Sequence, residues 1–356
     1  MLSFIKTLLQ ASAWPIQTPE PYSAFHILLC AAGIPLAVFL ARRLARTGTH
    51  PCGVLFICGL VLAVSELYKQ GFLYFVAGQG RYNWWYFPFQ LCSVPMYLCL
   101  ILPLFKHTPH CRTEKCICTF MQDFALLGGV MALAEPSGLM HPYLLLTLHG
   151  FLWHFMLIFI GLYCAMTGLG GRTPGDFVSM LPLFLACVCI ATFINVASHP
   201  YGNADMFYIS PYYPNGQIVF HQIALTIGTA AGNLLYLAAM VLGALSATCP
   251  WAGCFPGNRS DGFRRGPPPA IHSDIPIFSH ADFQSIKKPP LSGIRPDPRR
   301  LLPCPLSLIR SLFQKFAQIG KGGFLPLVLQ HVEKLLQKRS GPGMDGDVIL
   351  CILVIF

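Results

Sequence analysis

The stretch AFHILLCAAGIPLAVFLA, residues 24–41, contains no Asp, Glu, Lys or Arg. A helix rising about 1.5 Å per residue needs roughly 17–25 apolar residues to cross about 30 Å of hydrocarbon. Six further apolar runs follow, at 52–68, 89–105, 119–134, 144–169, 177–197 and 219–247. They lack the alternation of barrel strands, and open sheets leave unpaired amides in lipid. We therefore predict an all-α, polytopic membrane protein with about seven transmembrane helices, of which the short run at 119–134 could instead be re-entrant.

The composition supports a membrane location. Hydrophobic residues make up 54% of the chain, charged residues make up 11%, and the mean hydropathy is +0.57. Soluble domains carry charge on about a quarter of their residues, so this deficit predicts a surface that mostly faces lipid. The formal net charge is +10, and most of the excess falls after residue 250. A basic tail beside a membrane is typical of a cytoplasmic, lipid-facing segment, and we expect no nucleic-acid partner.

Basic residues in the loops predict the orientation. If the first run crosses from outside to inside, the inner loops carry Arg42, Arg43, Arg46, Lys106, Arg112, Lys115 and Arg172. The outer segments then carry only Lys6, Lys69 and Arg81. The positive-inside rule therefore predicts an outer N-terminus and a cytoplasmic C-terminus. We read residues 1–21, before the first run, as a short lead-in helix.

The chain changes character near residue 249. Residues 249–305 are rich in Pro, Gly, Ser and Arg without a helical or strand period, which favours disorder. Apolar and basic residues return at 307–317 and 323–338, as in short amphipathic helices. We predict two regions, a seven-helix membrane domain at 1–248 and a largely disordered basic tail at 249–356.

The fifteen cysteines do not predict a metal centre. Most lie singly within apolar runs, where Cys behaves as a small hydrophobe. The exception is the loop HTPHCRTEKCIC, which contains His107, His110, Cys111, Cys116 and Cys118. Its cysteine gaps do not match a zinc knuckle, which usually needs a second ligand pair elsewhere. We therefore predict a reduced basic loop without metal.

Polar side chains within the predicted helices gather at one end. Ionisable groups in spanning helices are costly and tend to mark working sites. On the predicted topology, the outer end holds His26, Glu66, Lys69, Cys92, Glu135, His149, His154 and His221. The loop at 199–215 adds Asn203, Asp205 and Tyr208 at the same end. We predict substrate-binding roles for Glu66, His154 and Tyr208, although Glu66 could instead pair with Lys69 at the end of its helix.

Cys92 and His149 lie at depths that allow them to meet. Cys92 is about 6 Å of helix beyond Pro88, and His149 is about 10 Å beyond Pro142. Both helices enter from the same face, and a nearby imidazole can activate a thiol as a nucleophile. Spacing alone does not separate this pair from a packed thiol and a hydrogen-bonded core histidine. His154 is the rival base on the same helix.

Four segments carry a family resemblance: PFQLCSVPMY at 88–97, FALLGGVM at 124–131, LHGFLWH at 148–154, and IN at 194–195 followed by NADMFY at 203–208. They resemble the YwaF-type (TP0381-like) family of integral membrane proteins, in the same order, over about residues 20–245. That family is more distantly similar to animal multi-pass ether-phospholipid acyltransferases and to membrane hydrolases of lipid esters. The resemblance implies lipid acyl chemistry.

Position by position, the resemblance implies that Cys92 is the nucleophile and His149 the proton shuttle. Asn195 and Asn203 match polar positions of the family, where an amide could donate to a developing oxyanion. Their alternative role is to fix the end of the helix and the following loop. His154 is additional to the pattern, which leaves the choice of base open.

These observations predict a membrane enzyme that transfers or hydrolyses a fatty-acyl group on a phospholipid, with no cofactor or metal. The alternative from another class is a transporter or sensor of small solutes, in which Glu66, Lys69, Glu135 and the histidines bind the solute or relay protons. A transporter should tolerate Cys92→Ser, whereas thioester chemistry should not. A third possibility is a membrane scaffold that acts through its basic tail, which deletion of residues 250–356 would abolish.

Overall fold

The computed structural model describes residues 2–48, 50–105 and 111–254. Within these ranges the regular structure is helical, which confirms the all-α membrane fold. The predicted disordered tail and its amphipathic segments lie outside the described residues, and the division at residue 248 stays a prediction. The last described helix continues beyond that position to Cys254.

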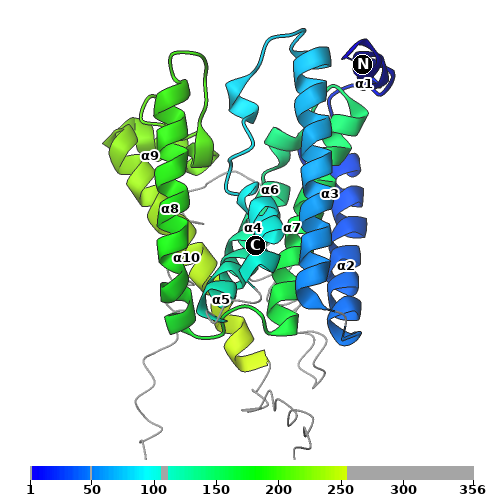
Figure 1. The fold of residues 1–356 in the computed structure, drawn as a ribbon. Helices are drawn as coiled ribbons and strands as arrows, with labels where there is room; N and C mark the ends of the chain where they lie inside the picture. The colour runs from blue at the N-terminus through cyan, green and yellow to red at the C-terminus, as the bar shows by residue number, and fades with distance from the viewer. Residues whose placement is uncertain (1, 49, 106–110, 255–356) are drawn as a thin grey trace, which may run out of the picture. The chain divides into compact units, whose positions relative to one another are not determined.

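The helices follow one another along the chain, with two longer connections at 78–93 and 199–217 (Figure 1). The α-helices are α1 (Leu2–Ala11), α2 (Ala24–Arg46), α3 (Pro51–Phe72), α4 (Val94–Phe105), α5 (Cys111–Phe120), α6 (Leu126–Ala134), α7 (Leu144–Thr167), α8 (Pro174–Ser198), α9 (Ile218–Ile227) and α10 (Thr229–Cys254). Two π-helical turns extend them, η1 (Leu73–Ala77) after α3 and η3 (Met121–Ala125) between α5 and α6. Three short 3₁₀ turns complete the described elements: η2 (Trp84–Tyr86), η4 (Pro136–Leu139) and η5 (Met206–Tyr208). The short lead-in helix expected at the N-terminus is confirmed as α1.

Six of the described helical spans are long and apolar enough to cross a membrane. They begin at Ala24, Pro51, Arg112, Leu144, Pro174 and Thr229. The run at 119–134, which could have been re-entrant, belongs to one of these spans, because α5, η3 and α6 form a continuous helical rod. Every predicted apolar run contains helix. The helix in the third run, at 89–105, is too short to span, so six of the seven predicted runs provide a spanning helix among the described residues.

The third run forms a helix of only 12 residues, α4. The prediction of a helix from residue 89 is wrong, because residues 87–93 form tight turns in which Phe89 N–H donates to Phe87 O and Ser93 N–H donates to Gln90 O, each at 2.8 Å. Pro95 lies in the first turn of α4, where a missing backbone N–H costs no helical hydrogen bond. The helix therefore begins after the turns that carry Cys92.

The seventh run is broken into two helices at Gly228. This glycine has φ +90° and ψ 153°, a conformation that an L side chain rarely adopts. The helices α9 and α10 pack against each other across the break. Their contact is tight, because a Cβ on Gly232 would lie 2.8 Å from the Cα of Ala224.

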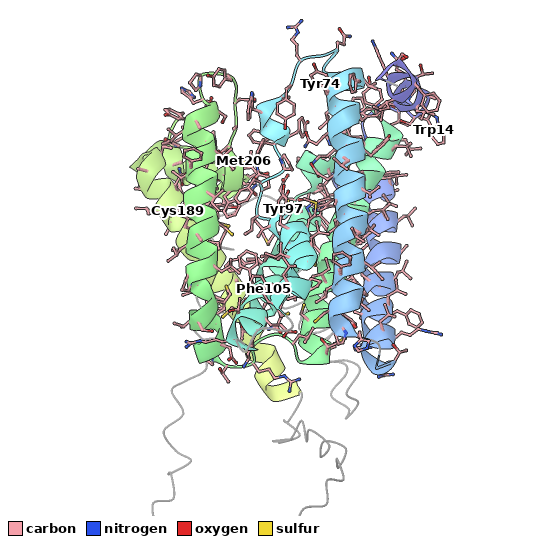
Figure 2. All side chains as sticks on the ribbon, viewed as in Figure 1. Trp14, Tyr74, Tyr97, Phe105, Cys189 and Met206 are labelled. Atoms are coloured by element: carbon pink, nitrogen blue, oxygen red, sulfur yellow. The ribbon has the colours of Figure 1, made fainter. Side chains whose placement is uncertain are left out.

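The α5–η3–α6 rod and α7 form the centre of the bundle, and α7 contacts α2, α3, α6 and η3. Their side chains are the most deeply buried of the described part, including Phe124, Leu157 and Tyr163. By contrast, α2, α3, α8 and α10 expose large apolar side chains, as expected of helices that face lipid. Figure 2 shows this contrast across α8, where Cys189 lies on the exposed side and Met206 lies against the inner side.

The cysteine-rich segment is not entirely a loop as predicted. Cys116 and Cys118 lie within α5, whereas residues 106–110 lie outside the described ranges. Lys115 of the same helix forms an ion pair with Asp176 at 2.6 Å, and Asp176 also completes a capping box with Thr173 at the start of α8. This ion pair joins α5 to the first turn of α8.

Glycines allow α6 and α7 to approach closely. A Cβ on Gly129 would lie 2.9 Å from Ile158 Cγ1 and 3.0 Å from the carbonyl oxygen of His154. A Cβ on Gly161 of α7 would lie 2.9 Å from the Cβ of Leu126. Small residues are the usual means by which membrane helices pack backbone to backbone, and Gly129 serves this purpose between α6 and α7. The neighbouring Gly128 faces open space instead.

We expect Gly129→Ala to lower the free energy of unfolding by about 1–3 kcal/mol, because the added methyl overlaps α7. Gly128→Ala is the matched control, because its Cβ meets no atom within 4 Å. We expect it to be neutral, or to gain up to about 1 kcal/mol from reduced backbone freedom. Thermal unfolding of both variants in detergent micelles checks this, and equal melting temperatures would contradict the proposed contact.

Candidate functional site

A cavity of about 270 Å³ lies where the ends of α3, α6 and α7 meet the start of α4 and the segments around η2 and η5. Its lining includes polar residues that the sequence placed at one end of the bundle: Lys69, Cys92, Glu135, His149, His154 and Tyr208. The predicted convergence is confirmed for these residues. The side chains of Trp85, Trp153 and Leu146 form an apolar part of the wall, so the cavity combines ionisable groups with apolar surface.

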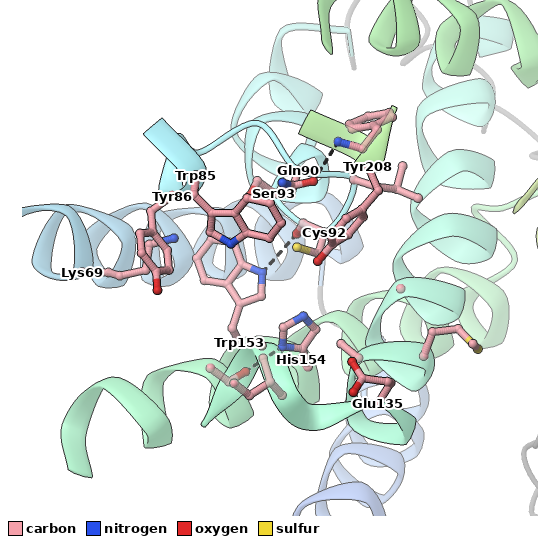
Figure 3. Close-up of a pocket in the computed structure, with 18 of the residues that line it drawn as sticks. Lys69, Trp85, Tyr86, Gln90, Cys92, Ser93, Glu135, Trp153, His154 and Tyr208 are labelled. Atoms are coloured by element: carbon pink, nitrogen blue, oxygen red, sulfur yellow. Dashed lines mark hydrogen bonds between the residues drawn. The ribbon is translucent and has the colours of Figure 1, made fainter. Parts of the chain in front are cut away.

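Cys92 lies in the turns before α4, where its backbone is held from two sides. The indole N–H of Trp153 on α7 donates to the carbonyl oxygen of Cys92 at 3.0 Å, as the dashed line in Figure 3 shows. The hydroxyl of Tyr97 donates to Pro88 O at 2.7 Å. Buried carbonyls need such donors when no helix supplies them. These bonds fix the segment that presents the thiol to the cavity.

Burial controls the protonation of the ionisable groups beside the cavity. It raises the pKa of the Cys92 thiol to about 11, although the nearby charge of Lys69 opposes the effect. It also lowers the pKa of His141, with Lys69 acting in the same direction. The thiol is therefore protonated and His141 is neutral near pH 7. Chemistry at Cys92 requires a base that takes the proton during attack.

Two histidines of α7 reach the same cavity. The Nδ1 atom of His154 lies 2.7 Å from Gly150 O, and a carbonyl oxygen can only accept, so Nδ1 carries the hydrogen. Its Nε2 atom is then a lone-pair acceptor. The Nε2 atom of His149 is buried and has no hydrogen-bond partner among the described residues. The ring of His149 packs 5.6 Å from that of Trp153. Both imidazoles can therefore accept a proton within the cavity.

Glu66 and Lys69 form an ion pair, with Lys69 Nζ 2.8 Å from Glu66 Oε1. This is the pairing that the sequence left open, and it is confirmed. The side chain of Gln70 also donates to the same Glu66 oxygen at 2.7 Å. Lys69 lines the cavity, whereas Glu66 is buried behind it. Glu66 therefore does not line the cavity itself, and it could act on a substrate only through its ion pair with Lys69.

Asn195 and Asn203 do not join Cys92 in the cavity. The amide of Asn195 is fully buried and bonds both backbone groups of Met206, accepting from its N–H at 2.6 Å and donating to its carbonyl at 3.0 Å. This geometry fits the alternative of fixing the loop. Asn203 is exposed and lines a separate cavity of about 300 Å³ with Asp205 and Tyr213.

The segment from Asp205 to Ser210 is strained and tightly held. Phe207 and Tyr208 both adopt left-handed backbone conformations, with φ +60° and +55°, which cost about 1–3 kcal/mol each outside glycine. Amide side chains from three elements bond this segment: Gln90 before α4, Asn195 on α8 and Asn233 on α10. These bonds maintain the conformation that carries Tyr208 into the cavity.

Tyr208 and Cys92 face each other across the cavity. In Figure 3 the sulfur of Cys92 and the hydroxyl of Tyr208 point toward one another, with the ring of His154 facing the same space. Trp85 packs edge-on against Tyr208 at 5.9 Å between ring centroids. The site thus contains a thiol, imidazoles and a phenol, which together suit nucleophilic attack on a carbonyl followed by proton transfer.

Sequence reasoning missed three contributors. Trp153 and Gln90 hold the backbone around Cys92 and Tyr208, and Tyr236 of α10 lines the cavity. A tyrosine or tryptophan within an apolar run is a usable signal, because its polar atom needs a partner when buried. No comparable signal marks Gln90, because its partners are backbone groups more than a hundred residues away.

Asp205 is buried, and its carboxylate accepts from Ser210 N–H at 2.8 Å. Burial raises its pKa from 3.8 to about 6. The folded protein thus holds this proton more tightly than the unfolded chain, so the free energy of unfolding falls as pH rises from about 4 to about 7. The contribution is at most about 3 kcal/mol.

We expect Asp205→Asn to remove this dependence, because an amide oxygen still accepts from Ser210 and cannot ionise. The variant should gain stability over the wild type at pH 7.5 and much less at pH 4.5. Melting temperatures of both proteins at the two pH values measure the effect. An equal difference at both pH values would show that Asp205 does not titrate in this range.

Comparison with known proteins gives one match by family. A family model described as the TMEM164 family matches residues 21–243. No curated protein matches the chain, and no solved structure matches it either. The matched range covers the helices that build the cavity, and the resemblance to the YwaF-type family is not confirmed by it. The chain belongs to the TMEM164 family of membrane proteins.

Proposed function

We propose that this protein transfers or hydrolyses a fatty-acyl group on a phospholipid, with Cys92 as the acyl acceptor. The observation that carries the proposal is the shared cavity, where one thiol, three imidazoles and three phenols line the same space. Apolar wall from Leu146, Trp85 and Trp153 suits the acyl end of a lipid. The exposed apolar surfaces of α2, α3 and α8 keep the protein in the bilayer that supplies this substrate.

The proposed reaction has two halves. The sulfur of Cys92 attacks the ester carbonyl carbon while an imidazole takes the thiol proton. The tetrahedral intermediate collapses, the C–O bond breaks, and the imidazolium returns the proton to the leaving alcohol. A second alcohol or water then attacks the thioester with the same imidazole as base. The thiol is restored, and no cofactor or metal enters the balance.

His149 and His154 are both eligible for the role of base. His149 is the residue that the family resemblance implies, and its Nε2 is buried without a partner among the described residues. His154 has its Nδ1 committed to Gly150 O, which leaves Nε2 free to accept a proton. Separate substitution of the two residues decides between them.

The proposed orientation remains the one that the loop charges predict, with the N-terminus outside and the C-terminus in the cytoplasm. On this orientation the cavity opens toward the non-cytoplasmic leaflet. The substrate is then a lipid of that leaflet, and its ester carbonyl has to reach the end of α7 that carries His149 and His154.

A transporter or sensor of polar solutes is the second candidate. It is favoured by the charge pattern of the same cavity, where Lys69, Glu135 and His141 lie beside the thiol. In this function the ionisable groups would bind the solute, and the thiol would have no chemical part. Substitution of Cys92 therefore distinguishes the acyl-transfer function from the transport function.

We expect the purified protein, incubated with isotope-labelled phospholipids, to form an acyl adduct on Cys92 that mass spectrometry detects. Cys92→Ala should abolish both adduct and lipid products, and Cys92→Ser should lower turnover by at least about a hundredfold. Substituting the true base, His149→Ala or His154→Ala, should slow adduct formation about 10²–10⁴-fold. Cys189→Ala and His50→Ala are controls at exposed positions. Unchanged products in Cys92→Ser would favour the transporter.

The raised pKa of Cys92 predicts slow thiol alkylation at neutral pH. We expect the iodoacetamide rate at Cys92 to keep rising up to at least about pH 10, nearly tenfold per pH unit, because only the thiolate reacts. Lys69→Met should slow alkylation at a given pH, since the lysine charge favours the thiolate. Mass spectrometry of the Cys92 peptide gives the rate, and a plateau below about pH 9 would argue against a desolvated thiol.

A further inference from the structure

We propose that the hydroxyl of Tyr208 is the oxyanion donor of this site and that Gln90 is the residue that positions it. The inference rests on the proposed acyl chemistry at Cys92. When the sulfur adds to the carbonyl carbon, the π electron pair moves onto the carbonyl oxygen. A hydrogen-bond donor aimed at that oxygen stabilises the intermediate until the C–O bond breaks.

Three candidate donors in and around the cavity already bond other groups. The indole N–H of Trp153 donates to the backbone of Cys92, and the amide of Asn195 bonds both backbone groups of Met206. The ammonium group of Lys69 pairs with Glu66 at 2.8 Å. The hydroxyl of Tyr208, by contrast, points toward the sulfur in the cavity (Figure 3).

Burial raises the pKa of Tyr208, so its hydroxyl keeps the proton that a donor needs. The side-chain amide of Gln217 interacts with the same hydroxyl and also lines the cavity. An amide N–H that donates to the phenol oxygen leaves the phenol hydrogen for another acceptor. The rival hydroxyl of Tyr236 belongs to a ring that packs against Phe220, with centroids 4.9 Å apart.

The placement of Tyr208 depends on a backbone conformation that the segment would not adopt by itself. Phe207 and Tyr208 are consecutive left-handed residues, and such strain persists where surrounding contacts over-determine it. Asn215 donates to Tyr208 O at 2.9 Å, and Asn195 holds Met206 on the other side. Such strain is expected where a side chain, here that of Tyr208, has to be held in one orientation.

Gln90 connects this segment directly to the nucleophile. Its Oε1 accepts from Phe207 N–H at 2.8 Å, and its Nε2 donates to Asp205 O at 2.9 Å. Gln90 lies two positions before Cys92 in the same set of turns. Phe89 and Phe207 stack alongside, with an interplanar angle of 10°. A change at Gln90 therefore alters the separation of sulfur and hydroxyl without removing either group.

The test compares two reactions of the same thiol in the full-length protein. A p-nitrophenyl ester of a short fatty acid acylates Cys92 through an oxyanion, whereas iodoacetamide alkylates it at a tetrahedral carbon without one. We expect Tyr208→Phe to slow acylation about 10²–10³-fold and to leave alkylation within about twofold. Tyr201→Phe, at an exposed position outside the cavity, is the matched control and should change neither rate.

Gln90→Ala should also lower the ratio of acylation to alkylation. In the Tyr208→Phe background it should lower that ratio no further, because a positioning residue acts through the group it positions. Thermal unfolding shows whether Gln90→Ala is folded, and the tyrosine variants decide the donor even if it is not.

The outcomes separate the two proposals. Absence of acylation at Cys92 in the wild type overturns the proposed function itself. Normal acylation in Tyr208→Phe, or an equal loss in the Tyr201→Phe control, overturns Tyr208 as the donor. Independent, additive effects of Gln90→Ala and Tyr208→Phe overturn the positioning role of Gln90.

Discussion

Paired amide hydrogen bonds on the segment from Asp205 to Ser210 are the interaction on which the site depends. Two side chains, Gln90 and Asn195, each bond one backbone N–H and one carbonyl of this segment. These side chains pair the backbone groups of the loop, as a neighbouring strand pairs the backbone groups of a strand in a sheet. Buried backbone groups without such partners would cost several kcal/mol in a low-dielectric environment. The segment therefore has one well-satisfied arrangement, and Tyr208 follows from it.

The fold could largely be predicted, because crossing a bilayer leaves few options. Long apolar runs in a bilayer have to be mostly helical, and each of the predicted runs contains helix. The start of α4 and the break at Gly228 could not be predicted, since both lie inside apolar runs where hydropathy is uniform. Turn geometry and a single left-handed glycine decide these points, and neither alters the hydropathy pattern.

The site could be predicted where the position of a residue along its helix decides whether its side chain reaches the cavity. Cys92, His149 and His154 were placed at one end by counting residues, and the cavity does bring them together. The roles of the amides were harder, because an Asn in an apolar helix can face a ligand or a backbone. For Asn195 the geometry supports the second role, since both of its polar atoms meet Met206. Such partners depend on how loops fold back, which spacing does not encode.

The π-helical turn η3 determines which side chains of α6 face the cavity. A π turn holds an extra residue relative to the α-helix around it, and each residue of an α-helix turns the chain by about 100°. The residues Met121–Ala125 thus set the azimuth at which α6 leaves the rod begun by α5. If Met121–Ala125 wound as ordinary α-helix with the same number of residues, Gly128, Gly129 and Glu135 would turn by about 100° around the helix axis. Gly129 would then leave its contact with α7, and Glu135 would leave the cavity, so the π winding of this stretch determines which side chains of α6 form the wall.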